Sequence, residues 1–200
     1  MGIRMNLDDK TACAETVQAW GFARDQGRWD DLRATFHPDG AIHVSWFKGA
    51  FADFVERCIA NWGKGSQAKH LLWPARVRGA GARAISETNV SILVRQTIDG
   101  VAVDLTSYAR FLDRHEKRDG VWKIVERACV YEFDRLDPVE PSDKFAALMA
   151  GANATRFPAA YRYMGYRVDA SGRALAEPVH YDGRAETEEL KARYEAWARG

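Results

Sequence analysis

Apolar residues recur at intervals of three and four in the first part of the chain, which is the spacing of amphipathic helices. The pattern predicts a helix over about residues 8–25, capped by one of its first two aspartates, then a break at Gly27 and a short helix over residues 29–36. The apolar positions are Cys13, Val17 and Trp20, followed by Trp29, Leu32 and Phe36. Turn-forming residues 38–40 end the second helix.

The pattern then changes to strands around one further helix. Residues 41–47 are typical of a strand, and residues 51–62 carry the clearest amphipathic stripe of the chain. That stripe consists of Phe51, Phe54, Val55, Cys58, Ile59 and Trp62. Three long β-like segments follow at about 82–96, 101–113 and 121–134, with hairpin turns at 98–101 and 117–120.

This order of elements predicts an α+β fold with a cone-like curved sheet, mixed or antiparallel, packed on the N-terminal helices. We expect two parts: an α+β barrel domain over residues 1–135 and a C-terminal helical extension over residues 136–200. The extension begins with a Pro-containing linker at 136–141. It continues with helical stretches near 142–150 and 185–198 and an aromatic segment at 157–166 between them, and it is predicted to act as a lid or an oligomer contact.

Composition narrows the classes of partner and location. The chain has 29 basic and 28 acidic residues, so its net charge of +1 gives no reason to expect nucleic acid or an anionic membrane as a partner. The three cysteines are widely spaced, which favours buried thiols in a reducing compartment. No apolar stretch approaches ~18 residues and no secretion signal is evident, so we expect a cytoplasmic protein.

Two titratable residues stand out as candidates for chemistry. Asp25 closes the first predicted helix, and His70 opens the apolar run 70–73 after a glycine-rich loop. Neutral imidazole is available near pH 7 to remove a proton, and a neighbouring carboxylate fixes its tautomer. If the first helix ends beside the strand that contains His70, the two residues form a carboxylate-oriented base.

Other sites lack support in the sequence. His37, His43 and His70 lack the short paired spacings of a metal site, so no metal is expected. The glycines at 79 and 81 precede a strand and open no helix, and residues 63–66 do not form a phosphate-binding loop. We therefore expect no nucleotide and no other cofactor.

The order and spacing of three motifs resemble the SnoaL-like branch of the nuclear transport factor 2-like superfamily. They are Asp25 with residues 29–36 before a Pro-Asp turn, the run Lys69-His-Leu-Leu-Trp-Pro-Ala-Arg-Val-Arg78, and the final strand 120–131. The resemblance covers about residues 8–135 and implies a cone-shaped fold with a central pocket. It also implies an Asp25–His70 dyad and a pocket arginine at Arg127, as in the hexachlorocyclohexane dehydrochlorinase and scytalone dehydratase group.

One feature of the dehydrochlorinase has no counterpart here. Its pocket lysine cannot be matched, because Trp20 and Arg24 occupy the corresponding part of the first helix. This departure argues against assuming a chlorinated substrate.

Strand parity suggests which further side chains line the pocket. On the last strand Arg127 and Tyr131 share a face of mixed polarity, and on the middle strand Tyr108 and Arg110 share a face. The predicted catalytic residues are His70, Asp25 and Arg127, and the predicted substrate-binding residues are Tyr108, Arg110, Tyr131, Asn89 and Trp46.

Each candidate has a structural alternative. His70 could be a core or surface histidine with satisfied hydrogen bonds, and Asp25 a solvated turn residue. Arg127 could be the ion-pair partner of Glu87 or Glu126, and the tyrosines could be ordinary core aromatics.

These features predict a cofactor-independent lyase that acts on a small hydrophobic, aromatic molecule. Elimination of water or halide fits best, and retro-aldol loss of formaldehyde would use the same base. The alternatives are an isomerase or polyketide-type cyclase of the same fold, a non-catalytic subunit resembling the β subunit of aromatic-ring dioxygenases, and a ligand-carrying domain. A curved sheet exposes its outer face, so a homodimer or homotrimer is expected.

Overall fold

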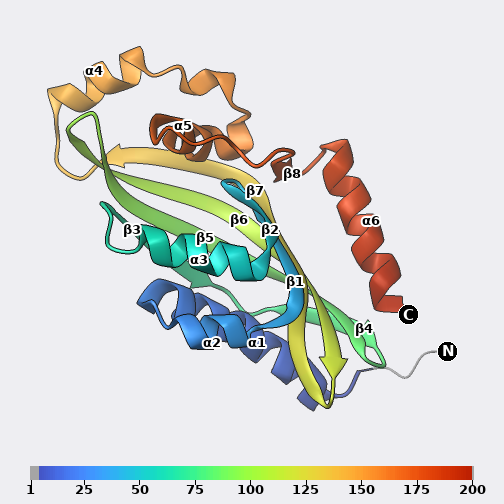
Figure 1. Ribbon diagram of the computed structural model, residues 1–200. Helices are drawn as coiled ribbons and strands as arrows, with labels where there is room; N and C mark the ends of the chain where they lie inside the picture. Colours follow the sequence, from blue (N-terminus) through green and yellow to red (C-terminus); the bar gives the residue numbers. More distant parts are fainter. Residues whose placement is uncertain (1–4, 200) are drawn as a thin grey trace.

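The computed structural model describes residues 5–199 and is built around one strongly curved sheet (Figure 1). Its strands are β1 (Phe36–Val44), β2 (Phe47–Ala50), β3 (Ser66–Leu72), β4 (Arg76–Ala80), β5 (Arg83–Ile98), β6 (Val101–Arg118), β7 (Val121–Pro138) and β8 (His180–Tyr181). The main path of the sheet is β2-β1-β7-β6-β5-β3, with β4 paired to β5 and β8 paired to β7. β1 and β8 run parallel to β7, and the other pairs are antiparallel.

The three long strands follow the sequence prediction, and so do their turns. Asp99-Gly100 and Asp119-Gly120 connect them, and all four residues have positive φ angles, between 47° and 80°. Two consecutive left-handed residues match the right-handed twist of the flanking strands, which is why Asp-Gly is favoured in two-residue hairpins. These hairpins fix the register of β5, β6 and β7.

Three helices cover the concave face of the sheet: α1 (Leu7–Gln26), α2 (Trp29–Ala34) and α3 (Phe51–Asn61) (Figure 1). Asn6 caps α1 through a bond from the Asp9 amide, so neither predicted aspartate is the cap. Gly27 ends the helix in the left-handed conformation, as the break in the pattern predicted. The second helix is shorter than predicted, because Phe36 already belongs to β1 and pairs with Ile124 of β7. Tertiary pairing here overrides the helical spacing.

The C-terminal extension contains α4 (Asp143–Gly151), two 3₁₀ turns (Ala154–Arg156 and Ala159–Tyr161), α5 (Arg162–Ala170) and α6 (Ala185–Arg199). β7 continues to Pro138, three residues into the predicted linker. Tyr161, Met164 and Val179 join the main hydrophobic core. α6 packs on the opposite, convex face of the sheet, where Leu190 and Tyr194 contact a separate apolar cluster (Figure 1). It covers part of the outer face that we expected to be free for oligomerisation.

The fold class predicted from the sequence is confirmed: helices pack on a curved mixed sheet, and a helical extension follows. Cys13, Cys58 and Cys129 are buried free thiols. Within residues 5–199, no helix combines the length and the apolar character needed to cross a membrane.

Candidate active site

Asp25 and His70 meet where the end of α1 lies beside β3. The Nδ1 atom of His70 lies 2.6 Å from one carboxylate oxygen of Asp25. The backbone N–H of the same histidine donates to the other oxygen at 2.7 Å. The Asp25 side chain is only 2% exposed and that of His70 is 11% exposed. This double contact fixes both the position of the strand residue and the orientation of its ring.

The charges around the pair favour an ionised acid and a neutral base. Burial alone would raise the pKa of Asp25, but the hydrogen bonds from His70 and the charge of Lys69 outweigh it, so the pKa lies below its usual value. Burial lowers the pKa of His70 despite the opposing effect of Asp25, and the positive charges of Arg24 and Arg127 lower it further. A carboxylate only accepts hydrogen bonds, so Nδ1 carries the proton and Nε2 is the basic atom.

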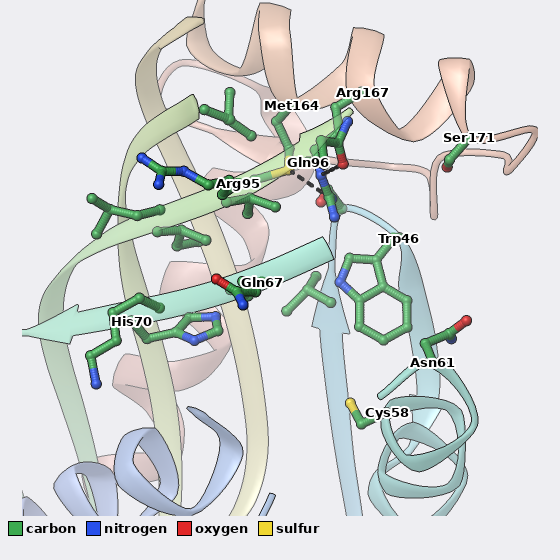
Figure 2. A pocket seen from close by; sticks show the side chains of 18 of the residues that line it. Trp46, Cys58, Asn61, Gln67, His70, Arg95, Gln96, Met164, Arg167 and Ser171 are labelled. Atoms are coloured by element: carbon green, nitrogen blue, oxygen red, sulfur yellow. Dashed lines mark hydrogen bonds between the residues drawn. The ribbon is translucent and has the colours of Figure 1, made fainter. Parts of the chain in front are cut away.

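His70 borders a large pocket between the sheet, α3 and the C-terminal extension (Figure 2). The cavity volume is about 1240 Å³, and its lining also includes Trp20, Phe54 and Phe111. Trp20 packs edge-on against the His70 ring, with ring centroids 5.3 Å apart. The pocket reaches the surface at the exposed residues 63–65 that join α3 to β3. Its size exceeds the range of roughly 300–1,000 Å³ common for small-molecule sites.

Two of the predicted binding residues line this pocket. Trp46 lies in the turn between β1 and β2, with its ring 5.3 Å from that of Phe54 (Figure 2). Tyr131 on β7 is 2% exposed, and its hydroxyl oxygen accepts the N–H of Ser45 at 3.0 Å. Burial raises the pKa of Tyr131 well above its ordinary value, so the hydroxyl keeps its proton.

Arg127 lies beneath the pocket and does not contribute to its lining. It is completely buried and forms two hydrogen bonds with Asp113, at 2.6 and 2.8 Å. Its guanidinium carbon lies 4.4 Å from the ring centroid of Trp20 and 4.3 Å from that of Phe111, two rings that do line the pocket. Arg127 therefore forms an ion pair, as the structural alternative proposed. Its partner, however, is Asp113 and not Glu87 or Glu126.

The prediction that Tyr108, Arg110 and Asn89 face the pocket is wrong. Asn89 is exposed, Tyr108 stacks on the exposed Phe133 with centroids 4.6 Å apart, and neither lines the pocket. Arg110 forms ion pairs on the convex face, with Glu87, Glu132 and Asp182. The reason is the pleat of β6: its odd-numbered residues from Val101 to Phe111 are buried, and Ala109 pairs with the inward Tyr131, so Tyr108 and Arg110 face outward.

Sequence reasoning missed the arginines of the pocket wall. Arg24 comes from α1, Arg167 from α5, and Arg173 from the segment after α5. The sequence pattern places Arg24 on the first helix but does not predict that it lines the pocket. The only local signal for Arg167 is its position at the end of an aromatic-rich segment, and nothing nearby in the sequence shows that this segment folds over the pocket.

Two other buried histidines make stability depend on pH. His115 is fully buried beside Ser86, and burial lowers its pKa to about 4. His180 lies against His43 in the C-terminal segment, and burial lowers its pKa to about 4 as well. Both stay neutral in the folded protein between pH 6.5 and pH 4, whereas the unfolded chain binds protons there.

We therefore expect the unfolding free energy to decrease as the pH falls from 6.5 towards 4, by about 2 kcal/mol between pH 6 and pH 5. Urea unfolding at several pH values measures this change. The variant His180→Gln should reduce this decrease by about 1 kcal/mol. An unfolding free energy that stays constant from pH 6.5 to pH 5 would contradict the expectation.

The protein is of the α+β class: helices pack on a strongly curved sheet, and a buried Asp–His pair borders its pocket. The chain belongs to the SnoaL-like domain family, whose pattern matches residues 5–128. It is 26% identical over 155 residues to pea pathogenicity protein 2 of Fusarium vanettenii, covering 76% of this chain and 66% of that protein. It is 27% identical over 141 residues to an uncharacterized protein of Emericella nidulans, covering 66% of this chain and 59% of the relative. The chain thus spans less than two thirds of the length of these relatives.

Solved structures show the same nuclear transport factor 2-like fold. A provisionally named scytalone dehydratase from Novosphingobium aromaticivorans has a TM-score of 0.57 at 18% identity, covering 69% of this chain and 97% of that one. A hexachlorocyclohexane dehydrochlorinase has a TM-score of 0.56 at 16% identity, covering 68% of this chain and 92% of that one. At these identities the similarity concerns the fold alone.

Proposed function

We propose that this protein is a cofactor-independent lyase for a small molecule with an aromatic or other hydrophobic body. His70 is the general base and Asp25 holds it in the productive tautomer. The observation that supports this most is the pair of Asp25–His70 contacts, which leave the second ring nitrogen without a hydrogen-bond partner among residues 5–199, on a ring that borders the pocket. The lyases among the proteins of similar fold agree with this proposal.

In the proposed elimination, His70 Nε2 takes a proton from a carbon next to an electron-withdrawing group. The electron pair of that C–H bond forms a C=C bond, and the leaving group departs from the adjacent carbon with its own bonding pair. The resulting imidazolium is stabilised by the negative charge of Asp25. The imidazolium or a hydroxyl group then protonates a departing hydroxide, which leaves as water.

Tyr131 is the candidate donor for developing negative charge. Its oxygen already accepts the Ser45 N–H, so its own O–H can point to a substrate or leaving-group oxygen. General base catalysis contributes only about 10²–10⁴-fold, so a donor of this kind is needed to stabilise the transition state.

A retro-aldol reaction would use the same base on a different proton. Nε2 would take the proton of a hydroxyl group, a carbonyl would form at that carbon, and the C–C bond would break to leave an enolate. Isomerisation would also begin with proton removal but would return the proton to another atom. These reactions differ in their products, so one assay separates them.

The test uses aryl-substituted β-hydroxy ketones such as 4-hydroxy-4-phenylbutan-2-one, with and without a carboxylate on the aromatic ring, in deuterated buffer, followed by NMR. Elimination gives the conjugated enone, retro-aldol cleavage gives benzaldehyde and acetone, and proton removal alone gives deuterium next to the carbonyl. We expect one of these outcomes at a rate far above that of the His70→Gln variant. Equal rates for the two proteins across the series would contradict the proposal.

A further inference from the structure

Arg167 is a buried cation without an acidic partner. It is 8% exposed and reaches from α5 to the wall of the pocket, above Trp46 (Figure 2). Its Nε donates to the amide oxygen of Gln96 at 2.8 Å, and Nη1 lies 3.9 Å from the sulfur of Met164. Among residues 5–199, no carboxylate lies within ion-pair distance of this guanidinium, so its charge is compensated by no protein group.

Three other arginines with little exposed surface are paired. Arg127 holds Asp113 through two hydrogen bonds, Arg114 pairs with Glu126, and Arg110 has three acidic partners. Their contacts follow the general rule, since a buried charge without a counter-charge is costly. Arg167 differs from these three in having no acidic partner, and of the four it is the one that lines the cavity.

The surrounding charges add to the positive potential. Seven basic residues line the pocket against three aspartates, of which Asp25 is bound to His70 and Asp104 to Arg95. Burial lowers the pKa of Arg167 to about 10, and the nearby charges of Arg173 and Arg24 act in the same direction. The guanidinium is therefore still charged at neutral pH. Asp99, on the turn between β5 and β6, is the one lining aspartate that forms no ion pair among the described residues, and the basic residues of the lining outnumber the acidic ones.

We propose that the ligand of this pocket carries an anionic group, such as a carboxylate, and that Arg167 binds it. The inference deepens the proposed function, on which it rests for a small-molecule occupant, by naming the charge of that molecule. Gln96 holds Nε and so orients the planar group, while the remaining N–H donors form the fork that suits a carboxylate or a sulfonate. The C-terminal extension is thereby assigned a recognition role, because it supplies this arginine.

The position of the arginine also divides the pocket. His70 comes from β3 and Arg167 from α5, and Figure 2 shows them at different parts of the wall, with Gln67 and Trp46 lining the space below Arg167. A volume of about 1240 Å³ leaves room for an aromatic body between the two. The anionic group of the ligand thus lies away from the carbon that reacts at His70. Its binding to Arg167 holds that carbon in position.

The experiment compares two fluorescent probes that differ by one charge. 1-Anilinonaphthalene-8-sulfonate is an aromatic anion, and N-phenyl-1-naphthylamine has the same rings without the sulfonate. The change Arg167→Gln should weaken binding of the sulfonate about 10- to 100-fold, the usual range for a hydrogen bond to a charged group. It should change binding of the neutral probe less than twofold.

Two further variants test whether the effect depends on the guanidinium of Arg167 and not on the loss of any positive charge. Arg167→Lys keeps the charge without the fork, so it should retain more of the sulfonate affinity than Arg167→Gln does. Arg118→Gln removes an arginine that pairs with Asp39 at the β6–β7 turn, and it should affect neither probe. Circular dichroism and thermal unfolding establish that each variant is folded.

The inference is overturned if the wild-type protein does not bind the sulfonate, if Arg167→Gln leaves its affinity unchanged, or if both probes weaken equally. The two proposals can fail separately. A wild-type protein without activity on the hydroxy ketones but with a charge-selective effect of Arg167→Gln would contradict the proposed lyase function alone. An active protein without that effect would contradict the anion site alone.

Discussion

Replacement of His70 by glutamine is expected to slow proton removal by about 10²–10⁴-fold. Glutamine retains a hydrogen-bonding group of similar reach but no basic nitrogen. The measurement is the rate of deuterium incorporation or product formation from the hydroxy ketones. A rate within a factor of three of the wild type would exclude His70 as the base.

Asp25→Asn is expected to lower the rate by a similar order for a different reason. The amide oxygen can still accept the backbone N–H of His70, so the strand stays in place. The amide nitrogen, however, is a donor, and it would face Nδ1 in place of an acceptor. Nδ1 would then give up its hydrogen, and the proton would move to Nε2, where it blocks the base.

The dependence of the rate on pH provides a second test of the same base. Since the pKa of His70 lies below its ordinary value, the wild-type rate should remain high until the pH falls below about 6.5. His37→Gln is the matched control, because that ring binds the Glu116 carbonyl oxygen outside the pocket. It should leave both the rate and the pH profile unchanged.

The second large effect concerns the buried Arg127–Asp113 pair. Arg127→Met should lower the unfolding free energy by about 3–5 kcal/mol, because it leaves the Asp113 carboxylate buried without its counter-charge. The double variant Arg127→Met/Asp113→Leu removes both charges and should recover most of this loss. Urea unfolding of the two single variants and the double variant gives the coupling free energy directly.

The same variants separate a catalytic role of Arg127 from a structural one. The guanidinium of Arg127 lies behind the rings of Trp20 and Phe111 and does not reach the pocket. We therefore expect the double variant to retain substantial activity. A double variant that is stable but as inactive as His70→Gln would contradict this expectation. It would indicate that Arg127 takes part in catalysis, as the sequence predicted.

Local sequence patterns determined many of the secondary-structure elements and their turns. The Asp-Gly pairs set the two long hairpins, and the spacing of apolar residues set α1 and α3, because both signals act over a few residues. The Asp25–His70 pair was also a prediction from the sequence, through the resemblance to a family in which these positions form a dyad. The structure places the two residues in hydrogen-bond contact.

Only the tertiary structure decided which faces and which segments form the pocket. A period of two shows that Tyr108 and Arg110 share a face, but only the packing of the opposite face of β6 in the core shows that theirs points outward. The partner of Arg127 lies on the neighbouring strand, and Arg167 enters from a helix that follows the family domain. These contacts join residues far apart in the chain, and their energies come from burial and charge pairing that exist only once the elements have packed.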